Sequence, residues 1–506
     1  MLINIASRKS DLARLQAYMV GDALKKHHSN IEIKYHFSSS LGDQNQDDPL
    51  WKMPSQGVFT QDFRADLIQG NIDMVVHSWK DLPTQMDEDT ILAASLPRAD
   101  HKDLLLVKKT AIKGVKRTKQ LRLLSSSPRR MFNLEGFLKK AFPNGLKNIT
   151  FEDVRGNIQT RLDKLLKLEA DGLIVAKAAI DRLLSASDYN QPDDNFDQSA
   201  NKIRQAIEQC EWMVLPASVN PPAAAQGALV VEIASKRKDL AKILSGINCT
   251  KTFNDVQKER QILSSYGGGC HQKIGVWVST IEQGRIISTQ GETEGGKSLK
   301  VFTLESNKKL LNNIKSQEIF NPKQLGDLFT REPIPVDAQA LKKMADANVL
   351  LLASSHIPDE YLSAIKSQTI WASGVASWFK LAKKNIWVNG VDDNLGGFCE
   401  RNLQFLLNKN SLNWLILTHE DSPSTPAIAT YRLMPNRSDI EMDNEKYFYW
   451  RSGSSFKRAI EIKPEILNAT HSCGLGHTYK IISSIVGEGR VFPFVNEEDW
   501  VNQISK

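Results

Sequence analysis

The sequence predicts an α/β protein of several domains. From the N-terminus to about residue 235, short apolar runs alternate with stretches of helical periodicity, which is typical of α/β layers with largely parallel strands. A block from about 237 to 315 contains a helix pattern followed by three strand patterns, and residues 330–506 alternate again. Because 506 residues are too many for one hydrophobic core, we expect three or four domains.

The strands are expected in chain order. In the first block the candidates are INIAS, IEIKYHFSSS, IDMVVHS, LRLLSSS and GLIVAKAAI. The Pro- and Ala-rich stretch LPASVNPPAAAQGALVVE, residues 215–232, predicts a return crossing that ends in a strand. The second block continues from a helix ending in VQKERQILSSY to the strands KIGVWVST, GRIISTQGE and KSLKVFTLE, which indicates a small α+β domain. The strand candidates of the tail are NVLLLAS, NWLILTH, KYFYWRS and RVFPFV.

Composition narrows the class of protein. No segment has the unbroken apolar length of a membrane helix, and MLINIASRKS predicts a first strand rather than a signal peptide, so we expect a cytoplasmic protein. The five cysteines show no CxxC pair and no histidine at metal-ligand spacing, which argues against a disulfide framework or a zinc site. Cys270, in SSYGGGCHQKIG, differs from an ordinary buried thiol because its glycine neighbours leave the sulfur reachable.

Basic residues recur where a predicted strand passes into a turn or helix. Open α/β sheets bind ligands at such strand ends, and arginine pairs well with carboxylate or phosphate. A formal net charge of +7 agrees with a cleft for a ligand that carries several acidic groups. Any one of these residues could instead be an ordinary surface cation, and no basic patch interleaved with aromatics indicates nucleic acid. The residues are Arg8, Lys80, Arg129, Arg130, Arg155 and Arg161.

One carboxylate lies in the same kind of position. Asp81 follows the apolar strand pattern of NIDMVVHSWKDLP, beside Lys80 and close to His77. A carboxylate among cations at a strand end, partly withdrawn from water, could transfer protons near neutral pH. The alternative is a turn or cap aspartate that bonds to nearby backbone N–H groups.

The ordered motifs IASRKSDLARLQ, GVFTQDF, HSWKDLPT, SSSPRR, RGNIQTRLDKL, PPAAAQGALVVE and GGGCHQKIG resemble the hydroxymethylbilane synthase family, also called porphobilinogen deaminase, over about residues 1–310. The resemblance implies two periplasmic-binding-protein-like lobes around a cleft and a small α+β domain with the cofactor cysteine. It places the first lobe at 1–98 plus 212–235, the second at 99–211 and the small domain at 236–315.

The family's chemistry would explain the exposed thiol. By resemblance, Cys270 holds a dipyrromethane cofactor through a thioether, and the cofactor primes the addition of four porphobilinogen units with loss of ammonia. Hydrolysis then releases hydroxymethylbilane, an intermediate of porphyrin and heme biosynthesis. The resemblance implies a transferase that acts as a monomer on small molecules, with no metal, nucleic acid or membrane partner.

Site residues follow by matching the motifs. Asp81 takes the catalytic role, in which it stabilises cationic pyrrole and azafulvene species and handles protons at the pyrrole nitrogens. The matched cofactor- and substrate-binding residues are Lys80, Ser127, Arg129, Arg130, Arg155, Arg161 and Arg182, with Arg8, Ser10 and Gln16 on the first-lobe wall. Gln56 and Phe59 match an active-site lid, where Gln56 replaces a usual lysine. The other departures include Pro128 for leucine, and Ala179 and Ala225 for glycine.

The tail, residues 330–506, lies beyond the usual end of a deaminase. Its stretches YWRSGSSFKRAIEI, SCGLGHTYKIISSIVGEG and ATYRLMP are similar to uroporphyrinogen-III synthase, a lyase that closes hydroxymethylbilane into a ring. The matched residues are Tyr431, Ser452, Ser454, Ser455 and Thr478. The sequence leaves two alternatives open. The tail could be an inactive structural lobe, and the whole chain could be a non-catalytic anion-binding protein, since fold alone does not fix function.

Overall fold

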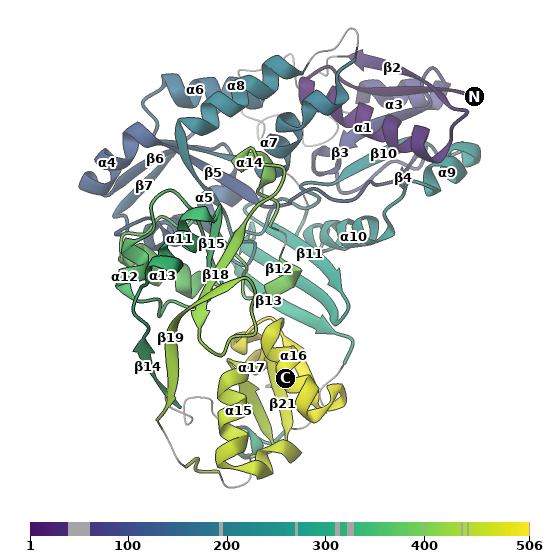
Figure 1. Ribbon diagram of the computed structural model, residues 1–506. Coiled ribbons are helices and arrows are strands. Elements are labelled where there is room, and N and C mark those ends of the chain that lie inside the picture. The colour runs from purple at the N-terminus through teal and green to yellow at the C-terminus, as the bar shows by residue number, and fades with distance from the viewer. Residues whose placement is uncertain are drawn as a thin grey trace.

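The computed structural model describes residues 1–38, 61–191, 196–268, 272–308, 314–320, 328–399, 401–436, 439–442 and 445–504. These residues form five β-sheets, numbered here in chain order, with helices packed against them. Figure 1 shows the first and second sheets side by side at the top, the fourth below the second, and the fifth at the bottom near the C-terminus. The mixed α/β class predicted from the sequence is confirmed.

The first sheet has the strand order β2-β1-β3-β10-β4. Strand β1 pairs parallel with β2 and β3, whereas β10 pairs antiparallel with β3 and β4, so only β10 runs against the others. Helices α1 and α9 pack apolar residues on one face and α3 packs on the other. The elements are β1 (Leu2–Arg8), α1 (Asp11–His27), β2 (Glu32–Ser38), α3 (Gln61–Gln69), β3 (Met74–Ser78), η2 (Trp79–Asp81), β4 (Thr90–Ala94), β10 (Leu229–Ala234) and α9 (Lys238–Ser245).

The second sheet repeats this plan in the order β7-β6-β8-β5-β9, with β5 as the one reversed strand. The chain crosses between the two sheets twice, after β4 and after β9. Residues 212–214, which the sequence prediction gave to the first lobe, pair with β5 in the second sheet. The elements are β5 (Asp103–Lys108), α4 (Lys109–Thr118), β6 (Gln120–Leu124), α5 (Pro128–Ala141), β7 (Asn148–Glu152), α6 (Ile158–Lys167), β8 (Gly172–Ala176), α7 (Lys177–Leu184), η3 (Ala186–Tyr189), α8 (Asp197–Glu208) and β9 (Cys210–Val214).

The third sheet is an antiparallel meander, β11-β12-β13, that packs against α10. Glu259 of α10 is fully buried, and its carboxylate accepts two bonds from the Arg98 guanidinium at 2.6 and 3.0 Å. This ion pair joins the third-sheet region to the first crossing between the lobes. The elements are α10 (Thr250–Ser264), β11 (Gly275–Ile281), β12 (Gly284–Glu292) and β13 (Ser298–Ser306).

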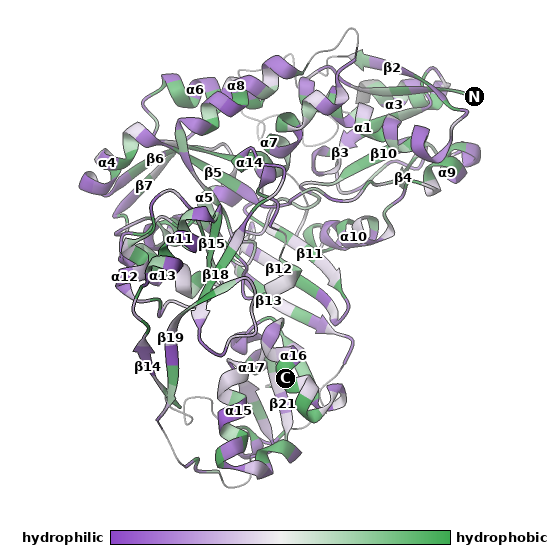
Figure 2. Ribbon diagram, in the orientation of Figure 1, coloured by the Kyte–Doolittle hydropathy of each residue, from purple (hydrophilic) through white to green (hydrophobic). Residues whose placement is uncertain are grey.

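The tail forms the fourth sheet, β14-β19-β18-β15-β16-β17, and the fifth, β20-β21-β22, whose three strands are parallel. Strands β15 and β18 are mainly hydrophobic, whereas helices α6 and α8 carry residues of both kinds, as expected for surface helices (Figure 2). The elements are η4 (Ser316–Glu318), β14 (Phe329–Pro333), α11 (Ala338–Asp346), β15 (Val349–Leu352), α12 (Asp359–Ser363), β16 (Thr369–Ala372), α13 (Val375–Lys383), β17 (Gly390–Val391), η5 (Gly396–Phe398), α14 (Gln404–Leu407), β18 (Trp414–His419), β19 (Ala427–Pro435), β20 (Tyr447–Trp450), α15 (Gly453–Ile462), η6 (Pro464–Asn468), β21 (Thr470–Gly474), α16 (His477–Val486), η7 (Glu488–Arg490), β22 (Val491–Phe494) and α17 (Glu497–Ile504).

The fourth sheet shares its hydrophobic core with the second sheet. One cluster of buried side chains runs from Leu105 of β5 to Leu350 of β15, and the two sheets meet where the Val214 N–H donates to the Asn389 carbonyl at 2.7 Å. On α13, Trp378 is fully buried, donates from Nε1 to the Ala141 carbonyl at 3.0 Å and contacts the ring of Phe137 edge-on. The first part of the tail is therefore a continuation of the second lobe.

The fifth sheet joins the third-sheet region in a similar way. Asp499 at the start of α17 is almost fully buried and accepts from the Thr303 hydroxyl at 2.5 Å and from the Leu304 N–H at 3.0 Å. The tail thus contacts the second lobe at one end and β13 at the other. Among the described residues, no helix is long and apolar enough to cross a membrane.

The shared core makes a stability prediction. Replacing Trp378 by alanine should lower the free energy of unfolding by about 3 to 5 kcal/mol, because the substitution leaves a large cavity and frees a buried carbonyl. Urea unfolding followed by far-UV circular dichroism measures this. The matched control is Phe405→Ala, since Phe405 is 41% exposed and its loss should cost less than about 1 kcal/mol. Equal midpoints for the two variants would contradict a shared core.

Candidate functional site

Asp81 lies where the first sheet ends at its carboxyl edge. Strand β3 is followed by the short η2 turn, in which Trp79 is buried and the Asp81 side chain remains 39% exposed. Because β1 and β3 are neighbouring parallel strands, Arg8 at the end of β1 lies beside it, with Nη1 3.9 Å from the Asp81 carboxylate. The predicted position of Asp81 at a strand end among cations agrees with this geometry.

A small cavity of about 30 Å³ lies beside Asp81. Its walls include Arg8, Gln16 and Ser78, and the Ser78 hydroxyl donates to Gln16 Oε1 at 3.0 Å. Gln16 comes from α1 and is only 3% exposed, so the predicted first-lobe wall residues Arg8 and Gln16 do lie together. Ser10 occupies the N-cap position of α1.

Beneath this cavity, His77 bonds through Nε2 to the Glu232 carboxylate at 2.9 Å. Glu232 is 1% exposed and also accepts from the Thr90 hydroxyl at 2.6 Å. Burial by itself would raise the pKa of Glu232. The hydrogen bond and charge of His77 lower it, and the hydrogen bond from Thr90 lowers it further. The pair connects β3 with β10 and β4 and supports the strand end that carries Asp81.

In the second lobe, Arg129 and Arg130 at the start of α5 both bond to Asp103. Arg129 donates to one carboxylate oxygen at 2.9 Å and Arg130 to the other at 2.7 Å. Asp103 is fully buried, and it also accepts from Asn220 and Gln226, each at 2.9 Å. Burial would raise the pKa of Asp103, but the two arginines hold it far below its usual range.

Gln226 and Lys80 extend this network toward Asp81. Gln226 Nε2 donates to Asp103, while its Oε1 accepts from the Lys80 ammonium at 3.4 Å. Burial lowers the pKa of Lys80, with Arg130 and Arg129 acting in the same direction and Asp81 and Asp103 opposing them. Lys80 therefore lies between the aspartate of the first lobe and the arginines of the second.

Arg161 completes a group of like charges. Its Nε donates to the Gly156 carbonyl at 2.8 Å. Burial lowers the pKa of Arg161 to about 10, helped by the charges of Arg130 and Arg155 and opposed by Asp81. Arg161 thus lies within electrostatic range of Arg130, Arg155 and Asp81. Mutual repulsion of this kind favours an acidic ligand.

Two matched residues have structural contacts instead. Ser127 is the N-cap of α5, and its hydroxyl accepts from the Arg130 N–H, with Pro128 at the first helical position where proline is tolerated. Arg182 is 7% exposed and donates from Nη2 to the Gly227 carbonyl at 2.7 Å. Burial lowers its pKa to about 10, opposed by the charge of Asp181. Gly227 directly follows Gln226, which accepts from Lys80, so Arg182 bonds to the backbone next to this network.

The predicted lid residues Gln56 and Phe59, and Cys270, lie outside the described residues. The chain that leads to Cys270 is described as far as Gly268, where a Cβ would be 2.8 Å from the Thr84 hydroxyl oxygen. In α10, the Arg260 guanidinium donates to the carbonyls of Leu82 and Pro83. The segment just before Cys270 is therefore held against the residues that directly follow Asp81.

The remaining departures from the family pattern are accommodated locally. Ala225 has φ +68°, a left-handed conformation that favours the glycine usual there, and its N–H donates to Glu259 at 2.7 Å. Ala179 is buried in α7.

Sequence reasoning did not single out Asp103, Gln226, Glu232 or Glu259. A charged residue directly before the apolar run of β5 was the available signal for Asp103.

The tail candidates lie on two different sheets. Ser452 caps α15, and its hydroxyl accepts from the Ser455 N–H at 3.1 Å, with Ser454 in the same first turn. Thr478 is in the first turn of α16. Helix α15 follows β20 and α16 follows β21. Because these two strands are parallel neighbours, both helices begin at the same edge of the fifth sheet. Tyr431, in contrast, is 5% exposed in the core shared with the second lobe.

Comparisons with known proteins cover the first part of the chain. The profile of a family described as porphobilinogen deaminase, dipyromethane cofactor binding domain, matches residues 3–242. Porphobilinogen deaminase of Nostoc sp. is 34% identical over 281 residues, which is 54% of this chain and 76% of that protein. Probable porphobilinogen deaminase of Thermoplasma volcanium is 30% identical over 302 residues, 60% of this chain and 89% of that protein.

A solved structure, YhfZ from Shigella flexneri, aligns over 52% of this chain and 91% of its own at 14% identity. Its TM-score of 0.25 is too low to bear on the fold.

The Asp103 network makes a second prediction. Asp103→Asn should lower the free energy of unfolding by about 3 to 5 kcal/mol, because it leaves two buried arginines with one neutral partner. The folded-state pKa of Asp103 is below its unfolded value, so its stabilisation is present above about pH 4 and lost as pH falls further. Urea titrations at pH 7 and pH 3.5 should therefore show a smaller difference between variant and parent at pH 3.5.

The control for this prediction is Asp163→Asn, which removes a partly exposed partner of Lys202. That change should cost less than about 1 kcal/mol. A comparable loss in both variants would contradict the central role of Asp103.

Proposed function

Because the chain belongs to the porphobilinogen deaminase family, we propose that it is a hydroxymethylbilane synthase. The reaction joins four porphobilinogen units head to tail with loss of ammonia and releases the linear tetrapyrrole by hydrolysis. The observation that carries the proposal is the meeting of Asp81 from the first lobe with the cationic residues of the second lobe. We propose the first two sheets with their helices as two binding lobes and the third-sheet region as the cofactor-bearing domain, and we expect a cytoplasmic monomer.

The cofactor of this family is dipyrromethane. When bound, it supplies the primer to which substrate units are added. Its acetate and propionate groups suit Arg161, which Arg130 and Arg155 repel, and the Arg130 Nε is buried without a hydrogen-bond partner among the described residues. We propose Cys270 as the attachment point, supported by the position of Gly268 against Thr84, close to Asp81 in the chain.

The residues divide the work between binding and proton handling. Arg8, Lys80, Arg155 and Arg161 would pair with ligand carboxylates and hold the pyrrole rings in register with Asp81. The partly exposed Asp81 carboxylate would accept hydrogen bonds from pyrrole N–H groups and stabilise positive charge that develops on the rings. Arg129 supports this arrangement indirectly, because its guanidinium donates to Asp103, Asn220 and Pro221.

A second activity is proposed for the tail, namely cyclisation of hydroxymethylbilane to uroporphyrinogen III. The supporting observation is that α15 and α16, which carry Ser452 and Thr478, begin at the same edge of the fifth sheet. Helix N-termini attract carboxylates through free N–H groups and the helix dipole. The buried Tyr431 gives this proposal no support, and the core shared with the second lobe favours the structural alternative.

Asp81→Asn should keep the fold and the cofactor and lower turnover at least about 100-fold, because the amide cannot accept a proton or balance positive charge. Steady-state consumption of porphobilinogen measures the effect, and Asp89→Asn, at an exposed position at the opposite end of the first sheet, is the control. A variant that turns over within a factor of three of the parent would exclude the proton-handling role. A non-catalytic anion-binding protein would show no turnover in either form.

Cys270→Ala should yield protein that lacks the mass of a dipyrromethane, because the four described cysteines are buried or half-buried. Intact-mass spectrometry with peptide mapping is the measurement, and Cys249→Ala, which should keep the added mass, is the control. An adduct of unchanged mass on Cys270→Ala would show that the attachment point lies elsewhere.

Product analysis tests the tail. If the tail is a cyclase, the full chain with porphobilinogen should give mainly the isomer III porphyrin after oxidation, and Thr478→Val should shift the product toward isomer I. Ser484→Ala, on the exposed side of α16, is the control. If the parent chain gives only isomer I, the tail is a structural element and not a cyclase.

A further inference from the structure

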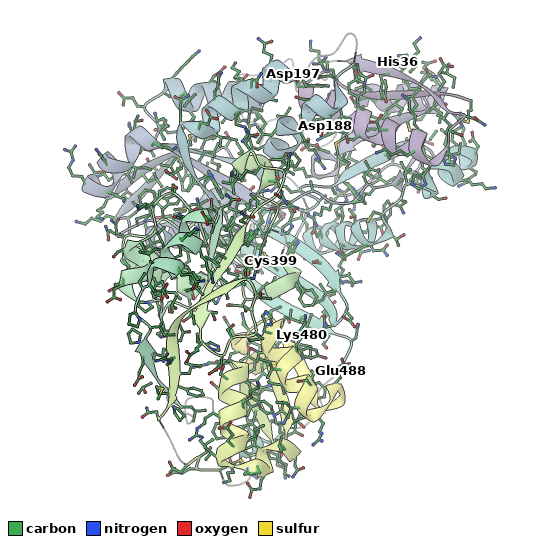
Figure 3. The ribbon with its side chains drawn as sticks, in the orientation of Figure 1. His36, Asp188, Asp197, Cys399, Lys480 and Glu488 are labelled. Atoms are coloured by element: carbon green, nitrogen blue, oxygen red, sulfur yellow. The ribbon has the colours of Figure 1, made fainter. Side chains whose placement is uncertain are left out.

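A cavity of about 250 Å³ lies at the junction of the deaminase region and the tail. Both crossings between the lobes reach it, through Pro97 and Ala217, and the third-sheet region contributes Trp277. The fourth wall is the tail segment from Asp393 to Cys399. Cys399 marks this junction near the centre of the molecule in Figure 3. The cavity is separate from the site around Asp81.

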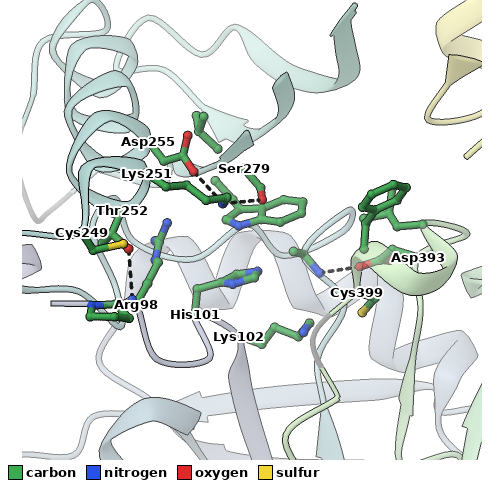
Figure 4. Close-up of a pocket in the computed structure, with 16 residues that line it drawn as sticks. Arg98, His101, Lys102, Cys249, Lys251, Thr252, Asp255, Ser279, Asp393 and Cys399 are labelled. Carbon is green, nitrogen blue, oxygen red and sulfur yellow. Dashed lines mark hydrogen bonds and ion pairs between the residues drawn. The ribbon is translucent and has the colours of Figure 1, made fainter. Parts of the chain in front are cut away.

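Two buried polar groups of this cavity can still bond to a ligand. His101 is 5% exposed, and its Nε2 has no hydrogen-bond partner among the described residues. Asp393 is 3% exposed and accepts from the Ala217 N–H at 3.0 Å and the Ser218 hydroxyl at 2.5 Å, with no ion-pair partner in the same part of the chain. Figure 4 shows them on opposite sides of the cavity, His101 beside Lys102 and Asp393 beside Cys399. Buried polar groups normally have partners, so a ligand is a natural occupant.

One carboxylate in the cavity wall, Asp393, forms no ion pair among the described residues. Each cation in the cavity wall has a carboxylate nearby. Arg98 bonds to Glu259, and Lys251 lies 3.0 Å from Asp255. Lys102 lies 3.5 Å from Asp100, which also pairs with Lys177. Burial raises the pKa of Asp393 to about 6, opposed by its bond to Ser218 and by the charge of Lys102. At neutral pH most molecules therefore carry a buried negative charge at this position.

The rest of the wall is apolar and partly aromatic. Trp277 stacks on His101 with ring centroids 4.7 Å apart, and Phe398 and Leu395 follow Asp393 on the tail side. Burial lowers the pKa of His101 well below its usual value, so the imidazole is neutral and can accept a hydrogen bond. Aromatic rings beside a carboxylate attract organic cations.

We propose that this cavity binds a small organic ammonium ion with a flat apolar body, its N–H groups donating to Asp393 and His101. The volume holds a single ring with a short side chain. Since the walls come from both lobe crossings, the third-sheet region and the tail, the occupant would contact every part that must move if the lobes move. The site exists only because the tail supplies Asp393 and Phe398.

The test uses the full cofactor-bearing chain and benzylammonium chloride as the probe in isothermal titration calorimetry at pH 7.5. We expect one saturable site with a Kd of about 1 mM or tighter. Benzyl alcohol, which has the same body without the charge, should bind at least tenfold more weakly. Asp393→Asn should weaken binding of the ammonium at least tenfold, whereas Asp346→Asn, at an exposed position on α11, should leave it unchanged.

Phe398→Leu keeps an apolar side chain at a half-buried position and should weaken binding about threefold or more, which keeps the test decisive if Asp393→Asn does not fold. Absence of saturable binding would overturn the proposal. Equal affinity for benzylammonium and benzyl alcohol would also overturn it. So would an affinity for benzylammonium that is the same in the parent, in Phe398→Leu and in any Asp393→Asn protein that folds. No deaminase turnover enters the measurement, so its failure is separate from any failure of the proposed function.

Discussion

The buried Asp103 carboxylate organises the centre of the molecule. It accepts four hydrogen bonds, from Arg129, Arg130, Asn220 and Gln226, and it has no exposed surface. An ionised group in such a place is stable only if its partners are fixed, and here they come from α5 and from the return crossing between the lobes. The start of α5 is thereby held against the crossing. Gln226 also accepts a hydrogen bond from Lys80, so the same network fixes the residue beside Asp81.

The second constraint is the core that the tail shares with the second lobe. The cluster that holds Leu105 and Leu123 also holds Leu350 and Trp378. An apolar surface of that size would be exposed if the tail were absent, and its burial is the main favourable term for the assembly. The fifth sheet adds a second attachment through Asp499 and β13. The tail therefore spans from the second lobe to the region that leads to Cys270.

The site around Asp81 and the junction cavity are lined by different residues and differ in charge. The site around Asp81 gathers cations that repel one another, which suits a ligand with several carboxylates. The junction cavity differs, because its cations pair with carboxylates whereas Asp393 forms no ion pair among the described residues. Both sites border the same crossing segments, so a ligand at either one bears on how the lobes are held.

The sequence by itself determined the order of elements and the position of Asp81, Arg8 and Lys80 at strand ends, because strand and turn patterns are local. The same ordered motifs identified the family. Only the tertiary structure decided which cations stay available for a ligand. Asp103 and Gln226 are 123 residues apart, and nothing local indicates that Asp103 takes both Arg129 and Arg130 or that Arg182 bonds to Gly227.

Tertiary structure alone also decided the place of the tail. Its strands could be predicted from apolar runs, but the contact of β17 with β9 and the junction cavity depend on side chains that meet across separate sheets. Packing and long-range ion pairing have no period in the sequence, which is why the lobes and the tail had to be seen together.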